Sequence, residues 1–454
     1  MSDTIAAIAT GAGTSAIGVI RISGEGALSA ADALFRPRAG GRMSEMPDRK
    51  LVYGELHASD GALLDLALCA VSRAPNSYTG EDTAEFQCHG GQRVLAEALR
   101  AVFSAGARQA QPGEFTKRAF LNGRLDLTQA EAVIDLIEAE TSDAAKNAAG
   151  QLGGAIRNRA EGIYAELVDI MSHFHAVLDY PDEDIEEFRL ADYAETLTRA
   201  ESELGRLLST FERGRVLKNG VRCAIIGKPN VGKSSLLNAL VGYDRAIVTD
   251  IAGTTRDTIT ERVSAGGVLL CLTDTAGIHG TSDEVEKMGV ERARAAAAEA
   301  ELVLAVFDGS QPADEADREI IAVAGKSGHP IAVINKADLP GADLSEVEKA
   351  FPTVCRVSSL SGEGIDSLED RISEMFDCGA PPSGEILTNE RQAEAVSRAL
   401  DGIARARDAM LGGVTPDAVL TEVESALGAL GEITGREVRE DIVSRIFERF
   451  CVGK

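Results

Sequence analysis

The architecture of the chain's centre follows from one stretch, Gly227-Lys228-Pro229-Asn230-Val231-Gly232-Lys233-Ser234. It has the spacing GxxxxGKS and lies between the apolar run Cys223-Ala224-Ile225-Ile226 and the helix-forming run 235–240. A strand, a glycine-rich turn and a helix in this order are typical of a phosphate-binding loop, whose amides wrap phosphates at a helix N-terminus. Lys233 can reach the β- and γ-phosphates, and the Ser234 hydroxyl can ligate Mg²⁺. The stretch therefore predicts a doubly wound, mostly parallel α/β sheet that binds a nucleoside triphosphate.

Two further motifs occur downstream in the order that a guanine-nucleotide site requires. Asp274-Thr275-Ala276-Gly277 follows the apolar run 268–272. Its carboxylate can hold the water shell of Mg²⁺, while the Gly277 amide meets the γ-phosphate. Asn335-Lys336-Ala337-Asp338 follows another apolar run, and the Asp338 carboxylate can accept two hydrogen bonds from the edge of guanine. Adenine cannot supply that pair of donors, so the sequence predicts GTP rather than ATP.

Shorter features complete the predicted nucleotide site and leave one gap in it. Ser358-Ser359-Leu360 lies where a third base-contacting loop belongs, and Thr255 is the natural second ligand of Mg²⁺. Ile278 stands where small signalling GTPases place a glutamine that orients water, and no arginine other than Arg256 offers itself as a built-in finger. Hydrolysis therefore needs another polar group, a monovalent cation or a partner. The residues expected to bind GTP are Asn230, Val231, Gly232, Lys233, Ser234, Ser235, Thr249, Asp250, Ile251, Ala252, Gly253, Thr254, Thr255, Asp274, Thr275, Ala276, Gly277, Asn335, Lys336, Ala337, Asp338, Ser358, Ser359 and Leu360.

The composition of the 454 residues is that of a folded, multidomain protein. Apolar residues make up 44%, enough for two to four hydrophobic cores. With 46 Lys and Arg against 72 Asp and Glu, the formal charge is −26, so any contact with nucleic acid needs a local basic patch or a partner. No CxxC pair, no secretory signal and no apolar run of about 18 residues occurs, so we expect a cytoplasmic protein without disulfides, zinc or a membrane span. His173 and His175 lack a third candidate ligand, which favours packing or surface positions over a metal site.

The period of the apolar residues divides the chain into segments. Residues 1–118 combine strand-like runs at 17–22 and 66–71 with a helical run at 94–102, which indicates an α+β domain. Residues 218–378 alternate strands and helices and form the expected GTPase domain.

The two remaining segments, 119–217 and 379–454, have a helical period. In the first, Thr128-Gln129-Ala130-Glu131 has the pattern of a capping box, and residues 190–213 predict a second long helix. Residues 380–384 have the composition of a linker. We expect the two helical parts to pack as one discontinuous domain into which the GTPase domain is inserted.

Several stretches outside the nucleotide motifs are also distinctive. They are Gly18-Val19-Ile20-Arg21-Ile22-Ser23-Gly24, Pro75-Asn76-Ser77-Tyr78-Thr79-Gly80-Glu81-Asp82, Pro112-Gly113-Glu114-Phe115, Arg118-Ala119-Phe120-Leu121-Asn122-Gly123-Arg124-Leu125-Asp126-Leu127, Asp250-Ile251-Ala252-Gly253-Thr254-Thr255-Arg256-Asp257 and Cys451-Val452-Gly453-Lys454. On these stretches, over essentially the whole chain, the sequence resembles the MnmE (TrmE) family of bacterial tRNA-modification GTPases, within the TrmE-Era-EngA-like P-loop GTPases.

The resemblance implies a function for the whole chain. Members of the family act with the FAD-dependent protein MnmG and place a carboxymethylaminomethyl or aminomethyl group on C5 of the wobble uridine of certain tRNAs. The one-carbon unit comes from 5-formyl- or methylene-tetrahydrofolate bound by the N-terminal domain. The resemblance further implies a homodimer joined through that domain, a heterotetramer with MnmG, and GTP hydrolysis stimulated by K⁺.

The resemblance also implies roles in hydrolysis for individual residues. Asn230, helped by Thr249, Ile251 and Thr254, would ligate K⁺, which supplies positive charge where other GTPases use an arginine finger. Glu286 would orient the attacking water through a bridging water, which fills the gap noted above. Taken without the family, the position of Asn230 is open to many residues and Glu286 could be a solvated helix residue.

For the folate, the resemblance implies Arg21, Glu85, Arg124 and Lys454 as binding residues. A carboxylate suits the edge of the pterin, and cations suit the glutamate tail. Arg21 lies in an apolar strand, where an unpaired charge is costly, whereas Glu85 could be a strand-face residue and Arg124 a surface charge. Cys451 is expected either as a catalytic thiol or as a buried structural cysteine, because the final Gly-Lys does not fit prenylation.

The sequence departs from the family pattern at three positions. Gly11 follows Thr10 where the family usually has proline, Arg124 stands where lysine is also common, and Ser359 replaces the usual alanine. Two other functions stay open at this point. One is a ribosome-assembly GTPase, although such a protein would carry a basic RNA-binding module. The other is a one-carbon transferase in which the GTPase domain is a regulator.

Overall fold

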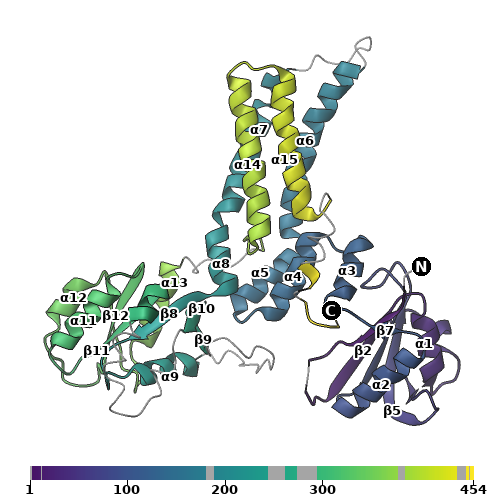
Figure 1. The fold of residues 1–454 in the computed structure, drawn as a ribbon, viewed down its shortest axis with the longest axis horizontal. Helices are drawn as coiled ribbons and strands as arrows, with labels where there is room; N and C mark the ends of the chain where they lie inside the picture. The colour runs from purple at the N-terminus through teal and green to yellow at the C-terminus, as the bar shows by residue number, and fades with distance from the viewer. Residues whose placement is uncertain are drawn as a thin grey trace. The chain divides into compact units, whose positions relative to one another are not determined.

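The computed structural model describes residues 3–11, 13–179, 189–243, 261–272, 294–376, 384–436, 446–448 and 450–453. The chain divides into two compact units. Their helices and strands are labelled in Figure 1. The first unit comprises Met1–Ile134, Ala160–Tyr164 and Leu427–Lys454, and the second comprises Asp135–Arg159 and Ala165–Ala426.

A seven-stranded sheet forms the body of the first unit, in the order β3-β4-β5-β6-β2-β1-β7. Its strands are β1 Ile5–Ile8, β2 Ile17–Ser23, β3 Phe35–Pro37, β4 Val52–His57, β5 Leu63–Ser72, β6 Thr83–His89 and β7 Arg108–Gln109. Every described pairing is antiparallel except that of β1 with β7. The strands expected at 17–22 and 66–71 are confirmed as β2 and β5.

The two faces of this sheet have different coverings. Helices α1 (Ala27–Leu34) and α2 (Gln92–Ser104) pack on one face, where Ile20 and Ile22 of β2 join the main core. Because side chains alternate along a strand, Arg21 projects from the opposite face. That alternation explains how a charged residue fits into an apolar strand, and the helix expected at 94–102 is confirmed as α2.

Two helices and the C-terminal segment complete the first unit. Helix α3 spans Glu114–Leu121, and α4 begins at Leu127 and ends at Glu138. The predicted capping box at Thr128 is wrong, because Asp126 holds the cap: its carboxylate accepts from the Gln129 amide at 2.9 Å, and the Gln129 side chain accepts from the Asp126 amide at 3.1 Å. Thr128 donates its hydroxyl to the same Asp126 carboxylate, so the helix begins before the predicted cap.

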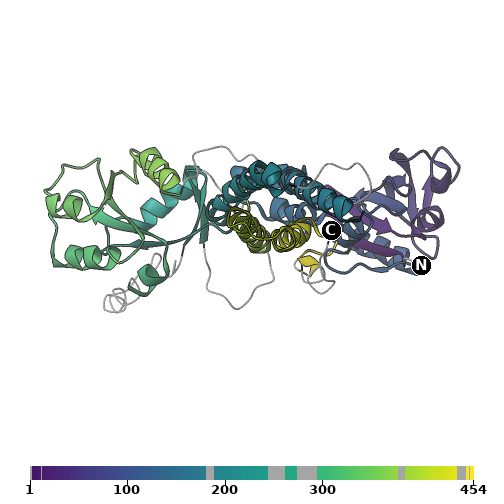
Figure 2. The ribbon, with the colours of Figure 1, turned by 90° about the horizontal axis from the view of Figure 1, so that it is seen from above.

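The second unit contains a six-stranded sheet in the order β13-β12-β11-β8-β10-β9, parallel except for β9. The strands are β8 Val221–Ile226, β9 Glu261–Ala265, β10 Val268–Leu272, β11 Leu302–Asp308, β12 His329–Asn335 and β13 Thr353–Arg356. The helices around it are α9 Lys233–Tyr243, α11 Glu315–Ala324, α12 Ser345–Ala350 and α13 Ile365–Met375. Helices α9 and α13 share one core with the sheet and α11 and α12 the other, so the sheet is covered on both faces (Figure 2). The predicted doubly wound GTPase fold is confirmed.

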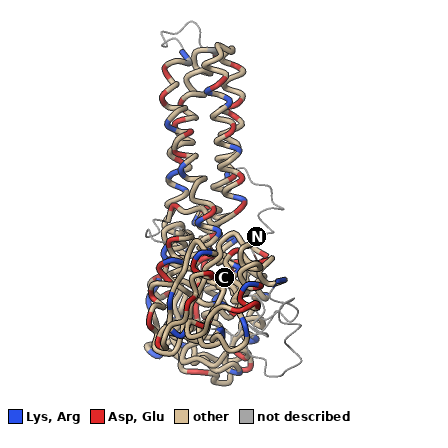
Figure 3. The backbone as a smooth tube through the Cα atoms, turned by 90° about the vertical axis from the view of Figure 1, so that its left-hand side faces the viewer, with Lys and Arg blue, Asp and Glu red and all other residues tan. Residues whose placement is uncertain are grey.

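Long helices flank the α/β segment in the sequence and belong mainly to the second unit, although parts of α6 and α15, residues 160–164 and 427–434, belong to the first. They are α5 Ser142–Leu152, α6 Ala155–Asp179, α7 Ala194–Ser209, α8 Phe211–Asn219, α14 Glu390–Leu411 and α15 Pro416–Thr434. Helix α14 packs along α7, and acidic and basic residues are interspersed along both (Figure 3). The side-chain amides of Asn147 and Gln151 donate to the carbonyl oxygen of Ile386 at 3.1 and 2.6 Å. Segments on either side of the α/β domain therefore form one discontinuous helical layer, as expected.

The prediction of a single helix at 190–213 is wrong, because the helix is interrupted at Thr210, between α7 and α8. The Thr210 hydroxyl donates to the Leu207 carbonyl at 2.7 Å and accepts from the Leu387 amide at 3.1 Å. A Cβ on Gly214 would lie 1.8 Å from the Leu387 carbonyl oxygen, so the segment that precedes α14 packs directly against α8. The expected linker at 380–384 lies outside the described residues apart from Gly384. No described helix combines the length and the apolar composition that a membrane crossing requires.

Candidate functional site

The predicted phosphate loop joins β8 to α9 in the second unit. Gly227 has φ 157°, and a Cβ there would lie 2.5 Å from the Val306 carbonyl oxygen. Gly232 has φ 98°, and a Cβ there would lie 2.2 Å from Nδ2 of Asn335. Both positions therefore require glycine, because β11 and β12 approach the loop closely. Asn230 lies at the tip with φ 63°, a left-handed conformation that asparagine tolerates better than most residues.

Lys233, the first residue of α9, lies across this loop. Its Nζ donates to the carbonyl oxygens of Gly227 at 2.8 Å and Lys228 at 2.7 Å. Burial lowers the pKa of Lys233, because desolvation disfavours its charged form. Phosphate oxygens would restore the lost solvation, which suits this ammonium group to an anionic ligand. Ser234 and Ser235 follow in the first turn of α9, at the helix N-terminus.

Lys228, a variable position of the loop, has a role that the sequence did not indicate. Its ammonium group contacts Asp314 at 2.8 Å and Asp317 at 2.7 Å, the two residues that cap α11. Burial would lower the pKa of Lys228, but the two carboxylates outweigh it and raise the pKa. The contact attaches the phosphate loop to α11, and a separation of 86 residues hides it from sequence reasoning.

The predicted base-contacting loops meet around Asn335, which is 2% exposed. Its Nδ2 donates to the Val231 carbonyl oxygen at 2.9 Å, and its Oδ1 accepts from the amide and hydroxyl of Ser359 at 3.0 and 2.9 Å. Asp338 accepts from the Ser358 hydroxyl at 2.6 Å. Three loops that are far apart in the sequence are thus hydrogen-bonded to one another. Leu360 follows them and is 90% exposed.

Lys336 and Ala337 complete this motif. Lys336 has φ 63°, and its Nζ contacts Oδ2 of Asp308 at 2.6 Å. Burial would raise the pKa of Asp308, but the hydrogen bonds from Lys336 and Ser310 leave it below its usual value. The Ala337 amide donates to the Val357 carbonyl at 3.0 Å. These contacts fix the loop that presents Asp338.

Several predicted residues lie outside the described part of the chain. They are Thr249, Asp250, Ile251, Ala252, Gly253, Thr254, Thr255, Arg256, Asp274, Thr275, Ala276, Gly277, Ile278, Glu286 and Lys454. Of the residues predicted to bind nucleotide, the structure therefore describes those of the phosphate loop with Ser235, the Asn335–Asp338 motif and the Ser358–Leu360 loop.

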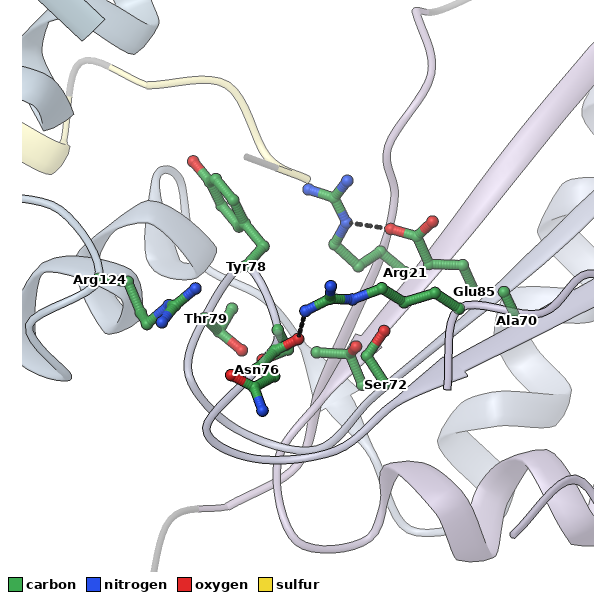
Figure 4. Close-up of a pocket in the computed structure, with 11 residues that line it drawn as sticks. Arg21, Ala70, Ser72, Asn76, Tyr78, Thr79, Glu85 and Arg124 are labelled. Atoms are coloured by element: carbon green, nitrogen blue, oxygen red, sulfur yellow. Dashed lines mark hydrogen bonds and ion pairs between the residues drawn. The ribbon is translucent and has the colours of Figure 1, made fainter. Parts of the chain in front are cut away.

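The first unit contains a cavity of about 390 Å³ on the sheet face opposite α1 and α2 (Figure 4). It is lined by Arg21, Arg49, Ala70, Ser72, Asn76, Ser77, Tyr78, Thr79, Thr83, Glu85 and Arg124. Arg21 of β2 is paired with Glu85 of β6 in the strand register, and Glu85 with Ala70 of β5. Three of the four residues expected to bind folate therefore line one cavity.

Arg21 and Glu85 form the polar floor of this cavity. Nε of Arg21 donates to Oε1 of Glu85 at 2.8 Å. The Arg21 guanidinium also lies 5.4 Å from the ring centre of Tyr78 and 5.8 Å from that of Phe115, within cation–π range. In Figure 4 the pair lies across the cavity from Arg124. A donor and an acceptor thus stand side by side at one end of the site.

The loop that forms one wall of the cavity is held by hydrogen bonds. The Tyr78 hydroxyl is 2.9 Å from that of Thr116, and Nδ2 of Asn122 donates to the Thr79 carbonyl at 2.7 Å. The Thr79 hydroxyl is 2.7 Å from that of Ser23. The wall is therefore preorganised in the folded unit.

A cluster of charges around the buried Arg118 adjoins this wall, since Glu81 accepts a hydrogen bond from Ser23. Arg118 is 9% exposed and contacts Glu81 at 2.9 Å, Asp3 at 2.7 Å and Glu114 at 3.0 Å. Arg108 contacts Glu114 at 2.6 Å. The cluster ties the chain before β1 and the loop after Thr79 to α3.

The C-terminal segment packs on the first unit beside β1. Val452 bridges to Pro112, and the Cys451 carbonyl accepts from the Gly113 amide at 3.3 Å. A Cβ on Gly453 would lie 2.3 Å from the carbonyl oxygen of Ile8 on β1. Ile8 follows Ala7, the residue that pairs with Arg21 in the strand register. The Cys451 side chain is exposed, so the buried structural role considered for it is wrong. Cys451 is not among the residues that line the cavity.

No group of three or more potential metal ligands occurs among the described His, Cys, Asp and Glu residues. His173 contacts the Tyr193 hydroxyl through Nδ1.

Comparisons with known proteins cover the whole chain. Residues 4–124 match the model described as GTP-binding protein TrmE N-terminus, and residues 127–451 match the MnmE helical domain. The tRNA modification GTPase MnmE of Symbiobacterium thermophilum is 44% identical over 458 residues, covering 100% of this chain and 99% of that protein. Proteins of the same name from Roseiflexus sp. and Acetivibrio thermocellus are 44% and 41% identical, each over 100% of this chain and 99% of the relative.

Proposed function

The chain belongs to the MnmE family of tRNA modification GTPases, and from this premise we propose that it uses GTP hydrolysis to drive a folate-dependent modification at C5 of the wobble uridine of certain tRNAs. The group added is carboxymethylaminomethyl or aminomethyl, and the carbon donor is 5-formyl- or methylene-tetrahydrofolate. The observation that carries the proposal is the Arg21–Glu85 pair in the cavity of the first unit.

In the GTP-binding step, each described loop has a separate task. Lys233 leaves its backbone acceptors and binds phosphate oxygens, while Asp338 accepts from the guanine edge. Asn335, in the same motif as Asp338, holds this motif against the phosphate loop through Val231 and against the Ser358–Leu360 loop through Ser359. Mg²⁺ would be held by Ser234 and by Thr255, which lies outside the described residues, and would neutralise phosphate charge.

For the hydrolysis step, we propose a K⁺ site and a water-orienting carboxylate. The K⁺ ligands are Asn230, Thr249, Ile251 and Thr254, and Glu286 orients the water. Of these residues, the structure describes Asn230, which is exposed at the loop tip, so its side chain is accessible to a cation. Substitution of Glu286 by alanine is expected to leave GTP binding intact and to lower turnover.

For the folate step, the cavity supplies complementary groups. The free oxygen of Glu85 can accept from the N–H groups of a pterin edge, while Arg21 donates to its carbonyl oxygen. Arg124 and Lys454 add positive charge for the glutamate tail. Cys451 is exposed on a segment that packs beside β1, so a reactive role for its thiol stays a proposal.

The partners follow from the family and from the charge of the chain. We propose a homodimer joined through residues 1–118 and a heterotetramer with the FAD-dependent protein MnmG, in the cytoplasm. With a formal charge of −26, the chain needs a local basic patch or MnmG to bind tRNA. The remaining proposed domains are the helical parts 119–217 and 379–454 and the GTPase domain 218–378. The alternative of a ribosome-assembly GTPase is disfavoured by full-length relatives that are named for tRNA modification.

The test is a tRNA nucleoside profile of a strain that lacks this chain, complemented with defined variants. Wild type should restore modified wobble uridine, and Glu85→Gln should not, because it replaces one carboxylate oxygen by an NH2 donor and removes the negative charge that the pterin N–H groups would face. The matched control is Glu97→Gln, an exposed glutamate on α2 whose ion pair with its helix neighbour Arg100 is also exposed. Unmodified uridine in the deletion strain supports the proposal, and an unchanged profile after deletion rejects it.

A further inference from the structure

The cavity of the first unit has more positive charge than its carboxylate balances. Its lining contains three arginines, Arg21, Arg49 and Arg124, against one glutamate, Glu85. Glu85 contacts Arg21 at 2.8 Å, and no carboxylate of the described residues forms an ion pair with Arg49 or Arg124. In a chain of formal charge −26, a pocket with two unpaired guanidinium groups is a local exception that suits an anionic ligand.

Arg49 is held at this cavity in an unusual backbone conformation. Its φ is 60°, which is unfavourable for a residue with a Cβ. Only two other described non-glycine residues have positive φ, Asn230 and Lys336, and both lie in nucleotide motifs. Strained backbone of this kind gathers at ligand sites, where the surrounding structure holds it.

The contacts of Arg49 fix both ends of the residue. Its amide donates to the Val71 carbonyl oxygen on β5 at 2.8 Å, and its guanidinium donates to the Asn76 carbonyl oxygen, a contact drawn as a dashed line in Figure 4. A carbonyl uses only part of the guanidinium, which has five N–H donors. The remaining donors are available to a carboxylate, for which the planar group is well shaped.

The polar groups of the cavity therefore divide into two kinds. The Arg21–Glu85 pair offers a donor and an acceptor together, which suits a neutral heterocycle edge. Arg49 and Arg124 offer donors and charge without an acceptor. A folate has this same division, with a pterin at one end and a glutamate bearing two carboxylates at the other.

Resting on the folate binding proposed above, we propose that Arg49 is a further ligand-binding residue that, together with Arg124, binds the glutamate carboxylates and selects folates over pterins that lack the glutamate. No sequence pattern indicates this role, since Arg49 lies in a polar turn outside the family stretches.

Calorimetry with the full chain and two ligands tests this inference. The ligands are 5-formyltetrahydrofolate and the methyl ester of 5-formyltetrahydropteroate, which lacks the glutamate and carries no carboxylate; this ester is called the pteroate below. Loss of one charge-assisted hydrogen-bonding partner at a solvent-accessible site weakens binding by about tenfold. Arg49→Gln should therefore lower the affinity for the folate about tenfold and change that for the pteroate little. It should also reduce the salt dependence of folate binding, whereas Arg49→Lys keeps part of both.

The control is Arg93→Gln, an exposed arginine on α2 outside the cavity lining, which should bind both ligands as wild type does. An unchanged thermal unfolding curve for Arg49→Gln separates lost binding from lost folding, and Arg49→Lys serves if that variant is unstable. Wild type that binds folate while Arg49→Gln binds it equally well, or loses the pteroate to the same extent, overturns the inference alone. Wild type that binds no folate overturns the proposed function as well.

Discussion

The side-chain amide of Asn335 donates a hydrogen bond of 2.9 Å to the carbonyl oxygen of Val231, and so joins the base-contacting motif to the phosphate loop. The other side of the same amide accepts twice from Ser359. A single buried carboxamide thus sets the spacing between the phosphate loop and the loop of Ser359, the two parts of the proposed GTP site that would hold opposite ends of the nucleotide.

Replacing Asn335 by alanine should weaken binding of both GTP and GDP. The change leaves the Val231 carbonyl and the Ser359 amide without these partners, which costs about 1–3 kcal/mol for each buried group left unsatisfied. Nucleotide dissociation constants measured with a fluorescent guanine nucleotide, with urea unfolding alongside, check this. Ser359→Ala is the matched control, because it keeps the amide contact and loses only the hydroxyl contact. Equal affinities in Asn335→Ala and wild type would contradict the linking role.

Replacing Asp338 by asparagine should change which base is bound. Asparagine cannot accept from both N–H groups of guanine, and two charge-assisted hydrogen bonds are worth about 1.5–3 kcal/mol each. Xanthine carries a carbonyl where guanine carries its amine, so the asparagine amide can donate to it. Competition between GTP and xanthosine triphosphate should therefore reverse in this variant. A variant that keeps its preference for GTP would remove Asp338 from base recognition.

Exchange of K⁺ for Na⁺ should slow GTP hydrolysis if Asn230 ligates a monovalent cation. Asn230→Gly is the informative variant, since glycine adopts φ 63° without strain and removes only the side chain. Its hydrolysis should be slow and alike in both salts, with GTP binding retained. Steady-state phosphate release in KCl and NaCl measures this, and wild-type rates that are equal in the two salts would defeat the proposal.

The charge cluster around Arg118 should make the first unit sensitive to acid. Burial would raise the pKa of Glu114, but hydrogen bonds from Arg108, the Gln111 amide and Arg118 outweigh it and leave the pKa below the usual value of 4.5. A carboxylate whose pKa is lower in the folded state contributes stability that is complete above the unfolded value and is lost as pH falls through the folded value. Glu114→Gln should therefore destabilise α3 at pH 7, and its penalty should shrink as the pH falls below 4.5 towards the lower folded-state pKa.

Hydrogen exchange of peptides from α3, measured as a function of urea concentration at pH 7 and pH 3.5, gives the free energy of unfolding of this helix and tests the dependence on pH. Glu97→Gln on α2 provides the comparison, since its partner is an exposed neighbour on the same helix. A penalty for Glu114→Gln that is the same at both pH values would show that the cluster does not depend on ionisation.

Sequence reasoning was strongest where a function resides in contiguous residues. The strand, loop and helix around Lys233 and the motif ending in Asp338 were predicted because their chemistry is local. The grouping of Arg21 and Glu85 required the resemblance to a family, and the strand register then supplied a physical reason for it.

The features that escaped prediction depend on contacts between distant residues. The pairing of Lys228 with Asp314 crosses 86 positions and has no local pattern. The cap at Asp126 was missed because two overlapping patterns, at Asp126 and at Thr128, fit the same helix start, and the reciprocal hydrogen bonds between Asp126 and Gln129 form at the earlier one. The break at Thr210 depends on Leu387, which no periodicity in the first helical segment reveals.

The contact between Thr210 and Leu387 also has a consequence for synthesis of the protein on the ribosome. Leu387 emerges 177 residues after Thr210. At a synthesis rate of about 5–20 residues per second, the segment around Leu387 is made roughly 10–35 s after α7 and α8, which it covers in the folded protein. The entire α/β domain emerges within that interval with all of its own strands, so it can mature while the exposed apolar faces of the helices on its N-terminal side are still open to chaperones.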